Sequence, residues 1–278
     1  MVVQHNLTAM NSNRMLGITT NTQAKQTERL ASGYRINRAA DDAAGLSVSE
    51  KMRRQIRGLD QASANAQDGV SLVQSAEGAL NEVHDMLQRM NELTVKAANG
   101  TYTTTQKQYI ADEINQLISE IDRIATTTKF NDQSVLNGSG VNAKSFSFQV
   151  GNESNETMSV EISKMTATKL ATNLKNQSWS AATQYSAVAS FITVISSALE
   201  KVASQRSALG AVQNRLEHTI NNLDNIVENT TAAESRIRDT DMAKSMVSYS
   251  NNQILAQAGQ AMLAQANQSN QGVLSLLQ

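Results

Sequence analysis

The stretch MRRQIRGLDQASANAQDGVSLVQSAEGALNEVHDML, residues 52–87, carries an apolar or small residue at every seventh position. These positions are Met52, Leu59, Ala66, Val73, Leu80 and Leu87. A sustained seven-residue period is typical of a coiled coil, because it keeps one stripe of a helix against its partner. The pattern predicts one helix from about Ala43 to Ala98, on the order of 80 Å long. Helices of ordinary globular domains are much shorter.

The composition of the chain also favours long helices. Its 278 residues include no proline and 13 glycines, whereas an average chain has about 5% proline and about 7% glycine. Proline breaks helix interiors and glycine weakens them. Aromatic residues make up only 4%, which is little for a compact globular core. We therefore expect an elongated, mostly helical protein rather than a large globular α/β enzyme.

A second long helix is predicted from about Ala181 to Arg236. Its heptad positions are Val188, Ile195, Val202, Leu209, Leu216 and Leu223. A shorter helix begins after a capping box formed by Thr105 and Gln108. Its apolar residues alternate at spacings of four and three: Ile110, Ile114, Leu117, Ile121 and Ile124. The expected fold is an antiparallel coiled-coil bundle built on these helices.

The period changes between the long helices. Two short segments alternate apolar and polar residues, with Phe146, Phe148 and Val150 in the first and Met158, Val160 and Ile162 in the second. A polar segment containing Gly151 and Asn152 separates them. Alternation on both sides of a polar loop predicts one small β-hairpin.

The two ends of the chain are rich in amides and nearly free of charge. Only Arg14 is formally charged within residues 1–24, and residues 245–278 carry no charge at all. Such tracts are often disordered linkers, but these keep apolar residues at helical spacing. We favour terminal helices, about Leu7 to Leu30 and from about Thr240, that order by packing among copies of themselves, where neutral amides avoid the cost of buried charge. The residues expected to pack in this assembly are Leu7, Met10, Met246, Tyr249, Ala256, Leu263, Val273 and Leu277.

Several function classes find no support in the sequence. A net charge of −1 gives no electrostatic case for nucleic acid, and no apolar run approaches the roughly 20 residues that span a bilayer. The absence of cysteine excludes disulfides, zinc ribbons and thiol catalysis. Phosphate-binding loops and metalloprotease motifs are missing, and Asp41 and Asp42 suit a helix N-terminus better than catalysis. We expect neither an enzyme nor a cofactor.

Long strings on both flanks of the chain resemble the signatures of bacterial flagellins. Residues 30–46, LASGYRINRAADDAAGL, resemble the N-terminal signature of that family, as do residues 55–59 and 65–72. Residues 209–216, LGAVQNRL, and residues 232–243, AAESRIRDTDMA, resemble the C-terminal signature. The resemblance spans the chain apart from about 45 residues in the middle, where there is no room for the outer domains that many flagellins carry.

The resemblance implies a subunit of the extracellular flagellar filament that polymerises with itself and serves motility. It implies inner-core terminal helices at 1–42 and 237–278, a long-helix domain at 43–130 and 177–236, and a hairpin with linkers at 131–176. It also implies flagellar cap and hook-junction proteins as partners, and a cytosolic export chaperone at the C-terminal segment. Export would use the type III apparatus without a cleaved signal peptide, since the first residues lack a basic region and an apolar stretch.

The same resemblance implies recognition of the free subunit by Toll-like receptor 5 of a host. The matching residues are Gln88, Arg89, Glu92 and Leu93, with Glu113 on the next helix. Because Leu87 and Met90 belong to the core stripe, we expect the first three to point outward, with Leu93 at the edge of that face. The alternatives are a hook–filament junction protein, which shares the design of the ends, and a generic coiled-coil scaffold.

Overall fold

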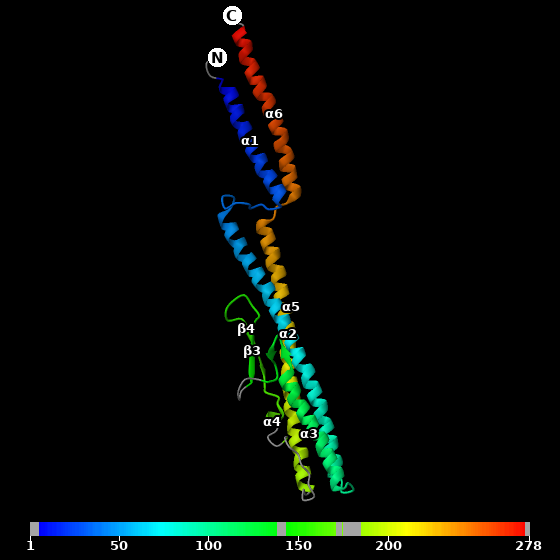
Figure 1. The fold of residues 1–278 in the computed structure, drawn as a ribbon. Helices are drawn as coiled ribbons and strands as arrows, with labels where there is room; N and C mark the ends of the chain where they lie inside the picture. The colour runs from blue at the N-terminus through cyan, green and yellow to red at the C-terminus, as the bar shows by residue number, and fades with distance from the viewer. Residues whose placement is uncertain (1–5, 138–142, 171–173, 175–184, 276–278) are drawn as a thin grey trace. The chain divides into compact units, whose positions relative to one another are not determined.

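The computed structural model describes residues 6–137, 143–170, 174 and 185–275, without the side chains of 185–187 and 270–275. The elements follow one another as α1 (Leu7–Ser32), α2 (Ala43–Ala98), α3 (Thr104–Thr127), β1 (Lys129–Phe130), β2 (Gln133–Ser134), β3 (Lys144–Gln149), β4 (Thr157–Ile162), α4 (Ala167–Leu170), α5 (Tyr185–Arg238) and α6 (Met242–Ser275) (Figure 1). The mostly helical fold with a small β-hairpin is confirmed.

The chain divides into two compact units. The first unit contains residues 1–56 and 228–278, and the second contains residues 57–227. The boundary falls within both α2 and α5, so each long helix contributes residues to both units.

The core of the second unit is formed by the heptad stripes of α2 and α5. Leu80, Leu87 and Ile195 are fully buried there, and α3 adds Ile114 and Ile121. The two long helices run antiparallel, because residues early in α2 contact residues late in α5.

Two polar contacts show this pairing. Ser63 Oγ donates to Asp224 Oδ1 at 3.3 Å, and Arg206 Nη2 lies 3.7 Å from Glu77 Oε1. Both contacts join α2 to α5 outside the apolar stripe. The antiparallel bundle predicted from the seven-residue period is thus the frame of this unit.

The capping box of α3 lies two residues earlier than predicted. Thr103 has an extended backbone, and its Oγ1 accepts a hydrogen bond from the Gln106 N–H at 3.4 Å. Gln106 Oε1 accepts in turn from the Thr103 N–H at 3.0 Å. The expected pair of Thr105 and Gln108 is therefore wrong. Both pairs satisfy the same four-residue pattern, and the earlier one lets the helix gain half a turn.

The predicted hairpin is confirmed as β3 and β4. Its register pairs Phe146 with Val160 and Phe148 with Met158. A second, very short antiparallel pair, β1 and β2, was not predicted. Asn131 and Asp132 join its strands with φ angles of 47° and 60°, a left-handed turn that tightly joins two strands. Strands of two residues are too short to show alternation in the sequence.

The first unit contains the antiparallel pair of α1 and α6. Asn6, which caps α1 through its side chain, donates from Nδ2 to the Ala266 carbonyl near the far end of α6. At the other end, α1 closes on Gly33, whose φ of 76° is the left-handed conformation that favours glycine. No residue of α1 is fully buried, so the pair has no core of its own.

We expect mild protease to remove α1 and α6 from the free subunit while the bundle of α2, α3 and α5 survives. The reason is that local stability follows buried apolar area, and only the bundle buries much of it. Limited trypsin digestion followed by mass spectrometry of the fragments measures this, and polymerised protein serves as the protected control. Equal resistance of these helices in both states would contradict the prediction.

Candidate functional site

The contact between α1 and α6 is a heptad seam made mostly of small and polar residues. Partly covered side chains recur at spacings of three and four along both helices. They are Ala9, Ser12, Leu16, Thr19, Gln23, Gln26 and Leu30 on α1, and Ser245, Tyr249, Asn252, Ala256, Gly259, Leu263 and Ala266 on α6. The helices approach closely, since a Cβ added to Gly259 would lie 3.3 Å from Leu16 Cδ1. The seam therefore has coiled-coil geometry but little apolar area.

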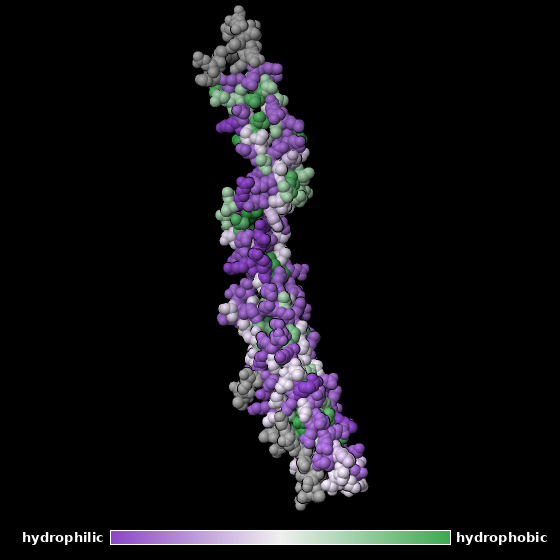
Figure 2. Space-filling model, viewed as in Figure 1, coloured by the Kyte–Doolittle hydropathy of each residue, from purple (hydrophilic) through white to green (hydrophobic). Residues whose placement is uncertain are grey.

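Most large apolar residues of the two helices lie outside this seam. Each is more than half exposed: Leu7, Met10, Met15 and Ile18 on α1, and Met246, Val247, Ile254, Leu255 and Met262 on α6. We call these nine residues the off-seam face. Figure 2 shows apolar side chains among polar ones on the surface of this helix pair. Exposed apolar residues gathered on a monomer usually mark an interaction surface.

The described residues that were expected to pack in the assembly fall into two groups, those of the off-seam face and those of the seam. Leu7, Met10 and Met246 belong to the off-seam face. Tyr249 and Leu263 are half-buried in the seam, and Ala256 is buried there. The side chain of Val273 and the whole of Leu277 lie outside the described residues. The sequence analysis missed Ile18, Ile254 and Leu255, although their position 100–200° around the helix from the seam could have identified them.

The connections at the bases of α1 and α6 bring two of the quoted strings together. Tyr34 and Asp239 form an antiparallel bridge, and the Arg35 N–H donates to the Arg238 carbonyl at 2.7 Å. The Arg238 guanidinium stacks 4.5 Å from the centre of the Tyr34 ring and pairs with Glu50 at 3.2 Å. The segment after α1 is thus joined by backbone hydrogen bonds to the end of α5, about 200 positions away in the sequence. We call the four residues Tyr34, Arg35, Arg238 and Asp239 the ladder.

Asp41 fixes the loop that follows this ladder. Its carboxylate pairs with Lys25 Nζ at 2.7 Å and accepts from the N–H groups of Asn37 and Arg38. The hydrogen bond from Lys25, with those from the two backbone amides, lowers the pKa of Asp41 from 3.8 to about 2. The predicted association of Asp41 with a helix N-terminus is wrong, since Asp42 caps α2 by accepting from the Gly45 N–H.

The residues expected to contact a receptor lie on α2 and α3 in the second unit. Arg89 is half exposed and bridges the two helices, with Nη2 3.0 Å from Glu113 Oε1 and Nη1 3.2 Å from Glu92 Oε2. These carboxylates raise the pKa of Arg89, Glu113 having the larger effect. Gln88 is exposed and its Nε2 lies 2.9 Å from His84 Nε2. The guanidinium is thus paired with carboxylates on both helices at an exposed surface.

Leu93 does not lie at the edge of this surface. It is 3% exposed and belongs to the same core as Leu87 and Met90. The apolar stripe of α2 is wide here, because both α3 and α5 pack against it and bury positions on two sides. The polar side chains Gln88, Arg89, Glu92 and Glu113 remain as the candidate receptor face.

Two further kinds of site were searched for in the described part of the chain. It contains no group of three or more histidine or acidic residues arranged to hold a metal ion. None of its helices combines the length and hydropathy that crossing a membrane requires.

These features define a class of protein. It is a helical subunit whose N-terminal and C-terminal helices pair with little buried apolar area and leave apolar residues exposed. Comparison with known proteins is consistent with this class. The family model for the bacterial flagellin N-terminal helical region matches residues 3–141, and the model for the C-terminal helical region matches residues 192–277. The chain belongs to the bacterial flagellin family.

Curated relatives match over the whole chain. A flagellin of Halalkalibacterium halodurans is 52% identical over 277 residues, and one of Bacillus subtilis is 48% identical over 305 residues. The 31.3 kDa flagellar filament core protein of Treponema maltophilum is 48% identical over 286 residues. In each case the alignment covers 100% of both chains. The protein is therefore a short flagellin, a structural filament subunit and not an enzyme.

A solved structure shares the fold at low identity. It is that of a Vibrio parahaemolyticus protein assigned to the flagellar hook-associated proteins, with a TM-score of 0.60 and 14% identity. It covers 72% of this chain and 100% of that one. Flagellins polymerise into the extracellular flagellar filament, so the off-seam face belongs to a chain that meets copies of itself.

We expect Asp41→Asn to loosen the ladder in a pH-dependent way. Because the folded-state pKa is lowered, the carboxylate stabilises the fold above about pH 4, and this contribution is lost as the pH falls towards 2. Parent and variant should therefore differ in thermal unfolding midpoint at pH 7 and converge near pH 2. Asp85→Asn, at an exposed position of α2, is the matched control and should leave the midpoint unchanged. A difference that persists at pH 2 would rule out this account.

Proposed function

We propose that subunits join in the filament through the off-seam face of α1 and α6. The observation that carries the proposal is the placement of apolar residues: the seam within one chain uses small and polar side chains, while Ile254, Leu255 and Met262 stay exposed. Burying apolar area contributes about 25 cal/mol per Å². This contribution becomes available only when a second copy covers the face.

The absence of charge near this face supports the same proposal. Residues 245–278 carry no charged side chain, so packing several copies together buries amides and hydroxyls that can bond to one another. A buried unpaired charge would cost several kcal/mol. In this proposal, residues 1–42 and 237–278 form the inner core, residues 43–130 and 177–236 the surrounding bundle, and residues 131–176 the hairpin region.

The remaining partners follow from membership of the family. We infer that the chain is exported through the flagellum without a cleaved signal peptide, and that a cytosolic chaperone binds its C-terminal segment before export. Flagellar cap and hook-junction proteins would contact it during assembly. Support for the chaperone comes from α6, whose exposed apolar residues need covering while the subunit is alone.

We also propose that Toll-like receptor 5 binds the free subunit through Gln88, Arg89, Glu92 and Glu113. The specific observation is that two carboxylates hold the Arg89 guanidinium between α2 and α3. A preorganised arginine loses little entropy when it binds and is a frequent hot-spot residue. The receptor surface does not include Leu93, which is buried.

Leu255→Lys should prevent polymerisation while the subunit stays folded. The reason is that a lysine would place a charge in an apolar contact between copies, whereas Leu255 makes little contact within its own chain. Seeded growth followed by electron microscopy measures polymerisation, and urea unfolding checks the fold. Gln260→Lys is the control, because it adds the same charge at an exposed position of α6 whose neighbours one turn away are not off-seam residues.

Lysine at Leu263 or Ala256 should also block growth, but Ala256→Lys should in addition loosen the α1–α6 pair because Ala256 is buried in the seam. Normal filaments from Leu255→Lys would show that copies do not meet through this face. Loss of growth with Gln260→Lys as well would show that added charge alone is harmful.

Arg89→Ala should weaken binding of the free subunit to purified receptor by more than about 1 kcal/mol, with a smaller effect for Glu113→Ala. Glu113 acts mainly by orienting the guanidinium, which Glu92 still holds in that variant. Surface plasmon resonance measures both. Arg123→Ala is the matched control, since Arg123 on α3 is also half exposed and also pairs with a glutamate three residues away. Unchanged binding by both variants would refute the proposed receptor face.

A further inference from the structure

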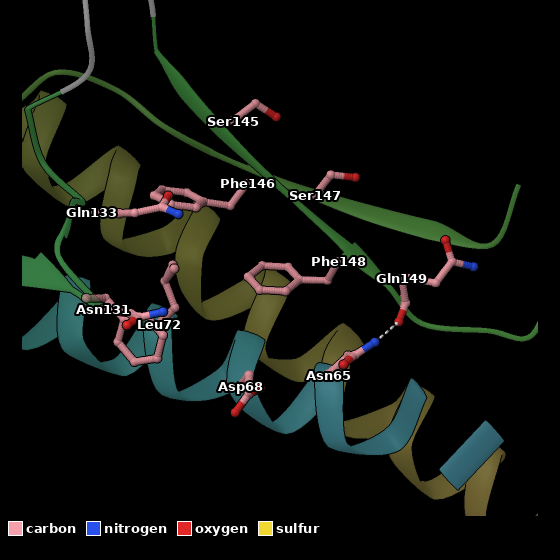
Figure 3. Close-up of a pocket in the computed structure, with 11 residues that line it drawn as sticks. Asn65, Asp68, Leu72, Asn131, Gln133, Ser145, Phe146, Ser147, Phe148 and Gln149 are labelled. Atoms are coloured by element: carbon pink, nitrogen blue, oxygen red, sulfur yellow. Dashed lines mark hydrogen bonds between the residues drawn. The ribbon is translucent and has the colours of Figure 1, made fainter. Parts of the chain in front are cut away.

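A groove of about 490 Å³ lies between β3 and α2 in the second unit (Figure 3). Phe146 and Phe148 point from β3 towards the helices, whereas the side chains of Ser145 and Ser147 point away from them. Both serines nevertheless line the groove. They therefore line it through their backbone atoms.

One side-chain hydrogen bond establishes which backbone groups of β3 face the groove. Asn65 Nδ2 on α2 donates to the Gln149 carbonyl at 3.1 Å, so Gln149 directs its carbonyl away from β4. In an antiparallel pair, alternate residues direct both backbone groups to the outer edge. Ser145 and Ser147 thus turn their N–H and C=O groups outward like Gln149. Within the described part of the chain, no group forms a hydrogen bond with these backbone atoms of the two serines.

One end of the opposite edge of the hairpin is covered. Gln205 Nε2 on α5 donates to the Glu161 carbonyl at 3.0 Å, and its Oε1 accepts from the Ser163 N–H at 3.3 Å. The edge of β3 is the one that adjoins the groove and its two phenylalanines. An unpaired strand edge beside apolar side chains is a template for a further strand, which adds main-chain hydrogen bonds and places alternate side chains in the groove.

Both ends of the open edge are closed by polar contacts. Lys144 Nζ donates to the Ser134 carbonyl of β2 at 2.9 Å, and the bond from Asn65 to Gln149 closes the other end. The edge between them spans residues 145–149, which is about 17 Å at roughly 3.4 Å per residue. The groove thus suits a segment of about five residues.

The charge of the groove indicates what kind of segment would bind. Asp68 of α2 is exposed, lines the groove and forms no ion pair with any described residue. An acidic group on the helix that Phe146 and Phe148 face suits a strand whose apolar residues and one basic residue lie two positions apart, and therefore on the same face. We propose that the β3 edge binds an extended peptide of another protein, with apolar side chains against Phe146 and Phe148 and a lysine or arginine opposite Asp68. This interaction goes beyond the filament role.

The test uses the full chain as a free subunit and the peptide Val-Thr-Val-Thr-Lys-amide, which carries fluorescein on its N-terminus and its valines and lysine on one face. Ser147→Pro removes one outward N–H, and proline is tolerated at edge positions where the N–H does not serve the ladder. Ser147→Ala keeps the N–H and is the matched control. Fluorescence anisotropy should show binding by the parent and Ser147→Ala, and a Kd at least about fivefold higher for Ser147→Pro. Asp68→Asn should weaken the lysine peptide but not the same peptide with threonine in place of lysine.

Hydrogen exchange checks that Ser147→Pro leaves the hairpin intact. The amides of Met158 and Val160 should stay protected, since they pair with Phe148 and Phe146, and those of Ser145 and Ser147 in the parent should become protected when the peptide binds. If the hairpin opens in the proline variant, a peptide N-methylated at its central amides replaces it and should not bind the parent.

Three outcomes would overturn the proposal. They are no saturable binding by the parent, equal Kd values for Ser147→Pro and Ser147→Ala with the hairpin intact, or undiminished binding of the N-methylated peptide. An N-acetylglucosamine oligomer is the second probe. Binding of this sugar without any effect of Ser147→Pro, together with no peptide binding, would assign the groove to a carbohydrate instead.

Discussion

The antiparallel packing of the α2 and α5 heptad stripes is the interaction on which the other features depend. It buries Val73, Leu80 and Leu87 against Ile195 and Val202, and α3 and the β3–β4 hairpin pack on the same core. Because this core is continuous, the surfaces that it supports are rigid. The Arg89–Glu113 bridge joins two helices whose apolar faces are already fixed, and the β3 edge is held open because both hairpin ends are attached to neighbouring elements.

The α1–α6 pair, by contrast, has little apolar core of its own. Its heptad geometry is regular, but the residues within its seam are small or polar, and α1 has no fully buried residue. Two helices with so little shared apolar area are marginal in water on their own. The ladder of Tyr34, Arg35, Arg238 and Asp239 adds hydrogen bonds and a ring contact at one end of the pair, where it joins the end of α1 to the end of α5. Large apolar side chains that would have strengthened the seam remain available to another copy.

This division of apolar residues explains how one chain serves two states. A free subunit needs a bundle that folds without a neighbouring copy, and α2, α3 and α5 provide it. In the proposed assembly, the charge-free ends make contacts that form only between copies, because their stabilisation requires neighbours. The proposed receptor face and the β3 edge both lie on this bundle.

The sequence alone determined the helices, the hairpin and the family, since each rests on a local pattern: the period of seven for α2 and α5, the alternation at Phe146 and Phe148, and the quoted strings. It also predicted that Gln88, Arg89 and Glu92 point outward, and all three are exposed. Tertiary structure decided what depends on neighbours. Leu93 is buried because α3 and α5 cover a wide stripe of α2, and Thr103 rather than Thr105 begins α3 because consecutive threonines offer the same local pattern. Which apolar residues of α1 and α6 face inward, and which backbone groups of β3 stay unpaired, follow from contacts between segments far apart in the chain, and no local pattern encodes them.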